Sequence, residues 1–186
     1  SILRKSVEEL SALKALKLGI VYLGVETGDR TLLEKVRKGA SYEQMVEAGK
    51  RVKEAGITLS ATVLLGLGGV EHGQQHALAT AKILSDIEPD FASALTLMVV
   101  PGTPLHEEME SGRFQLPAPF QLLEELGTII AHAHFTNCYF TANHASNYLP
   151  IKARLPRDKE AVVRLIQKVV SAQDASRLRP EFLRGL

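Results

Sequence analysis

Four short loops hold the residues of this sequence that could do chemistry. Each follows an apolar run of strand type, and in turn they contain a lone carboxylate, a glycine-rich turn, a proline-rich turn and a cluster of polar side chains. In parallel α/β folds, ligands gather at the carboxyl ends of the strands. Each loop is therefore a candidate ligand contact.

The first loop begins with a carboxylate, because Glu26 closes the apolar run of residues 20–25. A carboxylate without a partner at the end of a buried strand is costly. A ligand hydroxyl or ammonium group could satisfy it, and so could an ion pair with an Arg or Lys of a neighbouring strand. Position and residue type together favour the ligand.

The second and third loops are rich in turn residues. Residues 66–71 hold three glycines, which let a backbone approach a ligand, and they lead into a helix whose N-terminus attracts anionic or polar groups. No Gly-Lys-Ser/Thr follows, and Glu71 stands where a dinucleotide motif needs its third glycine. Residues 98–104 hold two prolines and a glycine, which favour a rigid turn suited to a flat ligand. A plain turn is the alternative for both.

The fourth loop, residues 141–150, gathers five hydrogen-bonding side chains. They are Asn143, His144, Ser146, Asn147 and Tyr148. Burying so many donors and acceptors without use is costly. The cluster therefore predicts a substrate-facing loop, with a polar network that holds the last helix as the alternative.

Other candidates carry less weight. His72 and His76 could share a helix face, but the Glu of a zinc-protease motif and a third ligand are lacking, so a solvated helix start is expected. His132 and His134 lie two apart on a helix, cannot face one ligand, and are expected to complement the helix dipole. Cys138 is expected to be a buried, inert thiol.

Alternating hydrophobic periods predict the elements that position these loops. Strands are expected at residues 20–25, 58–65, 91–100 and 136–141, with helices at 6–19, 30–37, 42–54, 72–87, 105–110, 120–133 and 156–175. Ser6 and Ser41 are the expected N-caps of the first and third helices. This βα repeat predicts an α/β fold, a partial (half) TIM-type barrel with parallel strands and additional C-terminal helices. We expect residues 1–112 to form the half barrel and residues 113–186 an extension packed on the same domain.

A half barrel has two open strand edges, which proteins normally pair or cover. Upstream strands, a covering segment or a second copy of the chain should therefore meet the strand at residue 20. A homo-oligomer is one expected form of this cover.

Composition excludes several classes of protein. The 186 residues carry 22 Lys and Arg against 21 Asp and Glu, a net charge of +1, too little to hold nucleic acid or an anionic membrane surface. No apolar stretch approaches the ~20 residues of a spanning helix. One cysteine excludes an internal disulfide and favours a reducing, cytoplasmic setting. The start at Ser1 resembles neither a native start nor a signal peptide, which favours a fragment.

Together the loops resemble the C-terminal half of the core of a radical S-adenosylmethionine (SAM) enzyme, of the iron–sulfur oxidoreductase-like kind. Residues 23–39 are similar to the superfamily's fourth strand, where a Gly-Val/Ile-Glu/Gln-Ser pattern precedes a helix and a basic residue. Residues 64–69 are similar to its fifth-strand Gly-Leu-Pro-Gly segment, and residues 100–104 to the turn after its sixth strand. Order and spacing agree over residues 6–112.

The resemblance implies a SAM site formed by three strand ends. Its cofactor-contacting residues are Glu26, Thr27, Arg37, Lys38, Thr62, Leu64, Gly66, Gly68, Met98, Val99 and Val100. By resemblance, Glu26 bonds the ribose or methionine part of SAM, and Arg37 or Lys38 faces its carboxylate. The fifth-strand residues lie against adenine and ribose, and the sixth-strand residues meet the adenine edge. Gly68 and Val70 depart from the pattern, which commonly has Pro and Glu there.

The resemblance also implies a part that this chain lacks. The family binds a [4Fe-4S] cluster through three cysteines, and this chain has one. We therefore expect the cluster only in the full-length parent, which would be the enzyme, and we expect the chain alone to be inactive. The extension would close the side of an unknown small-molecule substrate, with Asn143, His144, Asn147 and Tyr148 as contacts.

Two alternatives remain open at this point. One is part of a βα-barrel lyase or aldolase that binds a small anionic ligand, which fold analogy alone supports. The other is a non-catalytic binding module, which the missing cysteines permit.

Overall fold

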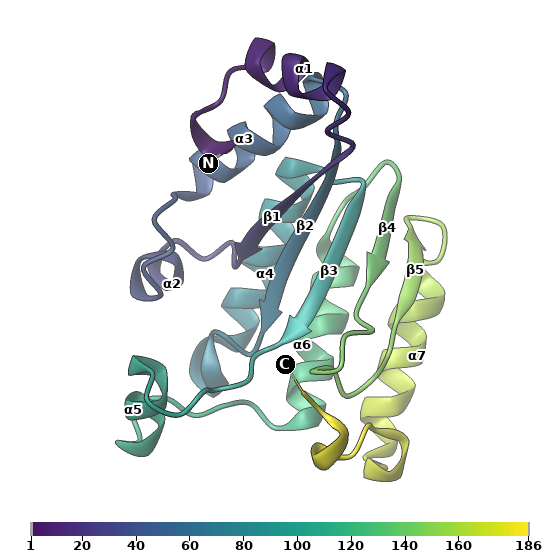
Figure 1. The fold of residues 1–186 in the computed structure, drawn as a ribbon. Helices are drawn as coiled ribbons and strands as arrows, with labels where there is room; N and C mark the ends of the chain where they lie inside the picture. The colour runs from purple at the N-terminus through teal and green to yellow at the C-terminus, as the bar shows by residue number, and fades with distance from the viewer. Residues whose placement is uncertain (1, 186) are drawn as a thin grey trace.

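A five-stranded sheet is the centre of the fold in the computed structural model, which describes residues 2–185. Its strands are β1 (Ile20–Glu26), β2 (Thr58–Leu65), β3 (Phe91–Thr96), β4 (Cys138–Thr141) and β5 (Lys152–Leu155). The spatial order follows the sequence, β1 to β4 run parallel, and β5 returns antiparallel to β4 (Figure 1). The parallel order predicted from the hydrophobic pattern is confirmed.

The long helices gather on one face of this sheet (Figure 1). The helices are α1 (Val7–Ala15), α2 (Arg30–Lys35), α3 (Tyr42–Glu54), α4 (Gly69–Ile87), α5 (Pro104–Glu110), α6 (Pro119–His132) and α7 (Lys159–Ala172). Three short 3₁₀ turns are η1 (Ile2–Arg4), η2 (Ala175–Arg177) and η3 (Glu181–Leu183). Because α3, α4, α6 and α7 all lie behind the sheet, these helices leave its other face uncovered.

Side-chain alternation separates the two faces of each strand. On β2, Leu59, Ala61 and Val63 are buried toward the helices, whereas Thr62 on the other face is only half-buried. The register places Gly24 of β1 beside Thr62. Strand β3 continues the row, and its aromatic ring at Phe91 is exposed. We call this helix-free side the open face.

Serine caps set the starts of two helices as the sequence predicts. Ser6 precedes α1 and Ser41 precedes α3, and both form a capping box with the residue three positions later. Such a box satisfies two backbone donors that the first helical turn leaves unpaired. No helix among residues 2–185 is both long and apolar enough to cross a membrane.

Several predicted boundaries differ from the structure, and one strand was not predicted. Strand β3 ends at Thr96 instead of residue 100, and β4 begins at Cys138 instead of residue 136. Helix α4 begins three residues earlier than predicted, at Gly69, whose positive φ of 62° starts the helix directly from the loop. Strand β5 was not predicted, because its four residues are a weak pattern that only pairing with β4 makes a strand.

Strand β1 lies at one edge of the sheet. Within the described residues it pairs only with β2, and Tyr22 on its open face is 73% exposed. Cover of this edge by a second copy or by further chain stays a prediction, as does the division of the chain at residue 112. Strand β4 pairs with β3, and α6 packs on α4, so residues on both sides of that division share one sheet and one helical layer.

Helix α4 lies flush against the loop after β1, and this contact gives the first prediction. A Cβ atom built on Gly28 would lie 1.9 Å from the backbone oxygen of Ala79, and the Gly28 N–H donates to Thr80 Oγ1 at 3.2 Å. Gly28→Ala must therefore push α4 away, and we expect a loss of ~1–3 kcal/mol in the free energy of unfolding, as in overpacked cores.

Urea denaturation of the chain measures this loss. Gly19→Ala is the matched control, because a Cβ at Gly19 meets nothing within 4 Å. Equal stability of the two variants would contradict the close packing of α4.

Candidate functional site

The carboxylate of Glu26 lies at the carboxyl end of β1, above the open face. Its backbone has a positive φ of 64°, and the pairing with β2 is irregular between Gly24 and Glu26. The carboxylate turns back over Gly24, since a Cβ built there would lie 2.6 Å from Glu26 Oε1. A strained backbone of this kind persists only where the surrounding structure determines it.

Lys38 is the partner of this carboxylate. Its Nζ lies 2.8 Å from Glu26 Oε1, and the two side chains are 23% and 25% exposed. The ion-pair alternative is therefore formed, although Lys38 comes from the turn after α2 rather than from a neighbouring strand. Both side chains are partly exposed, so the pair is not sealed in the core.

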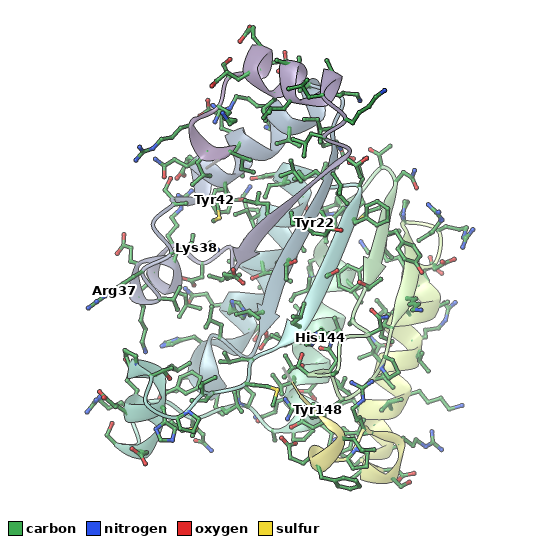
Figure 2. The ribbon with its side chains drawn as sticks, viewed as in Figure 1. Tyr22, Arg37, Lys38, Tyr42, His144 and Tyr148 are labelled. Carbon is green, nitrogen blue, oxygen red and sulfur yellow. The ribbon has the colours of Figure 1, made fainter. Side chains whose placement is uncertain are left out.

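The neighbouring candidates divide into accessible and inward-facing side chains. Arg37 is exposed and points away from the sheet (Figure 2), so Lys38 is the basic residue beside Glu26. Thr27 is fully buried and its Oγ1 lies 2.8 Å from His76 Nδ1, so its side chain faces the core.

The predicted contacts at the end of β2 are two side chains and, after them, two glycines. Thr62 and Leu64 are half-buried on the open face. Gly66 follows with a φ of 86°, which L side chains rarely adopt. Gly68 has no room for a side chain, because a Cβ there would lie 2.8 Å from His76 Cβ.

Residues 98–100 follow β3 rather than end it. Met98 and Val99 are half-buried and Val100 is exposed. Since β1, β2 and β3 are parallel, their carboxyl ends lie at the same end of the sheet. All three predicted groups of residues therefore lie at that end. The structure thus brings Glu26, Lys38 and the ends of β2 and β3 to one side of the molecule.

The polar loop after β4 is mostly a structural network. Asn147 is buried, accepts a hydrogen bond from Thr96 Oγ1 at 2.9 Å and donates one to the Ala94 carbonyl at 2.9 Å. Ser146 Oγ accepts from the Thr96 N–H at 3.1 Å. The loop therefore holds the end of β3.

Two arginines fix the same loop from the C-terminal segment. Arg179 donates to the carbonyls of His144, Ala145 and Asn147. The guanidinium carbon of Arg184 lies 4.0 Å from the ring centroid of Tyr148, whose hydroxyl donates to Glu181. The loop therefore forms a polar network, which was the alternative to a substrate-facing role. This network joins the loop to residues after α7 rather than to α7 itself. Asn143 and His144 stay exposed, and Figure 2 shows His144 and Tyr148 near this segment.

Sequence reasoning missed one buried contact between a histidine and a carboxylate. His76 is 0% exposed, so its expected place at a solvated helix start is wrong, whereas His72 is exposed as expected. Its Nε2 lies 3.2 Å from Oε1 of Glu125, which is 5% exposed. His76 lies on the same helical face as the buried Thr80 and Ile83, a spacing that the predicted helix 72–87 already contained.

The residues present do not fit an iron–sulfur cluster. Among residues 2–185, no group of three or more His, Cys, Asp or Glu side chains could hold a metal ion. Cys138 is buried, and burial raises the pKa of its thiol to about 12, which keeps it protonated. The expectation of an inert thiol agrees with this environment.

Comparison with known proteins finds one family model and several relatives that are similar to part of the chain. Residues 2–81 match the family model of the Radical SAM superfamily. The chain is 28% identical over 155 residues to the heme chaperone HemW of Bacillus subtilis, which covers 81% of this chain and 40% of HemW. It is 25% identical over 127 residues to an uncharacterized methyltransferase of Pyrococcus horikoshii, covering 67% of this chain and 27% of that protein.

Two solved structures share the fold. The archaeal Elp3 of Methanocaldococcus infernus, with its N-terminus deleted, superposes with a TM-score of 0.60 at 17% identity, over 89% of this chain and 39% of Elp3. Methylornithine synthase (PylB) gives a TM-score of 0.52 at 20% identity, over 70% of this chain and 37% of PylB. The chain thus spans less than half the length of each of these relatives and has the partial barrel fold that the strand spacing predicts. Residues 2–81 of the chain are therefore similar to the radical SAM superfamily, and the chain shares its fold with these two solved structures.

Proposed function

We propose that the chain supplies the SAM-binding and substrate-facing part of a radical SAM enzyme, whose cluster-binding cysteines lie outside these 186 residues. The accessible Glu26–Lys38 pair at the end of β1 is the observation that carries the proposal. In a complete enzyme of this family, SAM supplies the 5′-deoxyadenosyl group for radical chemistry.

The charges of this pair suit the amino-acid end of SAM. A free amino-acid group carries one ammonium and one carboxylate, and the pair offers one carboxylate and one ammonium 2.8 Å apart. Exchanging the internal ion pair for two ligand ion pairs keeps every charge partnered, which a partly buried site requires. Glu26 would accept from the ligand, and Lys38 would donate to it.

The other predicted contacts complete the proposed site. Thr62, Leu64 and Gly66 would lie along adenine and ribose, and Met98, Val99 and Val100 would meet the adenine edge, because these strand ends share the edge with Glu26. The relatives are named as a heme chaperone, a methyltransferase and a synthase, so they favour no single substrate. We propose a small-molecule substrate and, from cysteine usage, a cytoplasmic setting.

Gly24 gives a test of the ion pair that spares the fold. A Cβ at this position would displace only the flexible ends of Glu26 and Lys38, 2.6 and 3.1 Å away. Gly24→Ala should therefore leave the unfolding midpoint near that of the wild type. In the full-length protein it should weaken SAM binding, as Glu26→Gln should by ~1–3 kcal/mol, the range for losing a charged hydrogen-bond partner. Isothermal titration with SAM measures the affinity.

The control for this test is Gly19→Ala, which alters no contact of the pair. Unchanged SAM affinity in both Gly24→Ala and Glu26→Gln would overturn the proposed role of the pair. Unchanged affinity with a large loss of stability in Glu26→Gln would assign the ion pair to folding alone.

Cluster formation separates the chain from its proposed parent. Three thiolates are needed, and the chain offers one buried thiol. Iron and sulfide reconstitution of the 186-residue chain should therefore give no [4Fe-4S] absorbance and no 5′-deoxyadenosine from SAM. A cluster in this chain would contradict that expectation. A full-length protein that also forms none would favour the non-catalytic binding module.

Two loop residues should respond differently to truncation. His144 is exposed, and its Nδ1 accepts from the Ser146 N–H at 3.2 Å, so His144→Ala should cost about 1 kcal/mol or less in the free energy of unfolding. In the full-length enzyme it should lower substrate turnover while sparing uncoupled SAM cleavage. Asn147 is buried in the network of the loop, so Asn147→Ala should also cost ~1–3 kcal/mol in the free energy of unfolding. Parallel loss of SAM cleavage and turnover in His144→Ala would assign the loop to the cofactor instead.

A further inference from the structure

A buried histidine of α4 joins three separate segments. His76 Nδ1 lies 2.8 Å from Thr27 Oγ1, directly after β1, and Nε2 lies 2.9 Å from the Leu64 carbonyl near the end of β2. The same Nε2 lies 3.2 Å from Glu125 Oε1 on α6. One imidazole ring thus contacts both strand ends that carry the proposed ligand contacts.

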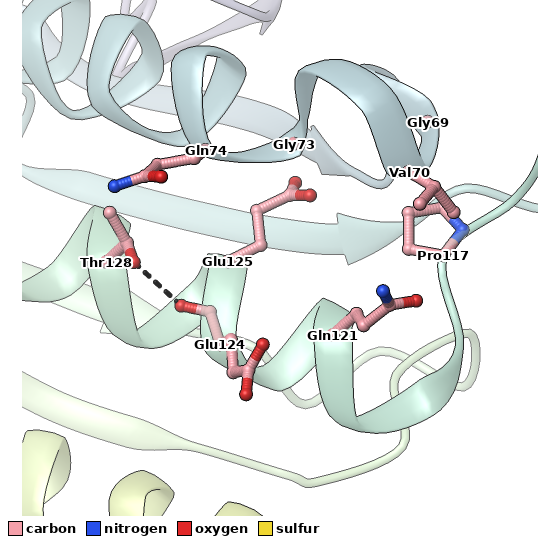
Figure 3. A pocket seen from close by; sticks show the side chains of 9 residues that line it. All are labelled: Gly69, Val70, Gly73, Gln74, Pro117, Gln121, Glu124, Glu125 and Thr128. Atoms are coloured by element: carbon pink, nitrogen blue, oxygen red, sulfur yellow. Dashed lines mark hydrogen bonds between the residues drawn. The ribbon is translucent and has the colours of Figure 1, made fainter.

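Glu125 also forms a hydrogen bond directly to the backbone of the loop after β2. Its Oε1 accepts a hydrogen bond from the Gly66 N–H at 2.8 Å. Figure 3 shows Glu125 projecting from α6 toward α4, below Gly73, at a cavity of about 240 Å³ between the two helices. A carboxylate on the helical side of the sheet therefore fixes the first peptide after β2.

Both ring nitrogens of His76 have partners. Nδ1 lies beside Thr27 Oγ1, which also accepts from the Asp29 N–H at 2.9 Å, so the threonine hydroxyl links the histidine to the start of α2. Nε2 lies beside the Leu64 carbonyl and the Glu125 carboxylate. The ring is therefore held from both sides.

The contact lies beside the two backbone positions that need external support. Glu26 and Gly66 both have positive φ, 64° and 86°, and the contacts hold Thr27 next to Glu26 and the N–H of Gly66 itself. A non-glycine residue in this region costs of order 1–3 kcal/mol, so neighbouring contacts must determine its backbone.

We infer that His76 and Glu125 are positioning residues: from behind the sheet, they hold Glu26 and Gly66 in the geometry in which the loops bind their ligand. Neither residue reaches the open face, since both are buried between α4, α6 and the strand ends. The identity of the ligand as SAM rests on the proposed function, whereas the hold on the loops does not.

Amide exchange of the 186-residue chain tests the hold without any ligand. Glu125→Leu removes the acceptor of the Gly66 N–H, so exchange at Gly66 should rise by about tenfold or more beyond any change in global unfolding. Glu125→Gln keeps an acceptor oxygen and should restore most of the protection. The matched control is Glu124→Leu, because Glu124 is the exposed neighbour on the same helix.

His76 gives the second arm of the same experiment. His76→Phe keeps a ring of similar shape but removes both nitrogens, so exchange should rise at Thr27 and Gly66 together, whereas His72→Phe on the exposed turn should change neither. If Glu125→Leu fails to fold, Glu125→Asp, which withdraws the carboxylate by one methylene, replaces it. Exchange that follows global stability alone in the Glu125 and His76 variants would overturn the inference.

SAM titration of the full-length variants separates this inference from the proposed function. We expect SAM affinity to fall in Glu125→Leu and to recover in Glu125→Gln, in step with Gly66 exchange. A wild-type protein that binds no SAM, with Gly66 exchange still responding, would overturn the proposed function and keep the hold on the loops. Unchanged affinity despite faster exchange would show that the hold does not serve binding.

Discussion

The close approach of α4 to the ends of β1 and β2 is the constraint on which the rest of the structure depends. Gly28 and Gly68 leave no room for a side chain, because a Cβ at either position would lie less than 3 Å from an atom of α4. This proximity lets Thr80 accept from the Gly28 N–H and lets His76 reach both loops. The helical layer thus determines where the backbone after β1 and β2 lies.

As a consequence, the two sides of the sheet differ at the strand ends. One side has an ion pair, and the other has buried residues that support the loops. On the open face, Glu26 and Lys38 form a partly exposed ion pair, which solvent keeps weak and exchangeable. On the helical side, His76 and Glu125 are buried and fully engaged with backbone and side-chain partners. Rigid support behind an exchangeable contact is the arrangement that a preorganised binding site needs.

The sequence predicted the parallel strands, the helix caps and the loops because each depends on local signals: periodicity, Ser6 and Ser41 as caps, and glycine-rich turns. It did not predict β5, whose four residues become a strand only by pairing with β4, a contact made by tertiary structure. His76 was misplaced because its burial depends on packing against α6, and Glu125 gave no motif at all. The ion pair of Glu26 with Lys38 was likewise not predicted, because Lys38 comes from the turn after α2 and not from a neighbouring strand.

A crystal structure of the full-length protein with SAM is the most direct test of the central claim, that this chain holds the cofactor at the end of β1. We predict the ammonium and carboxylate of SAM within hydrogen-bond distance of Glu26 and Lys38, with the φ of Glu26 still positive. SAM bound elsewhere, with the Glu26–Lys38 pair closed at its present 2.8 Å, would contradict the account.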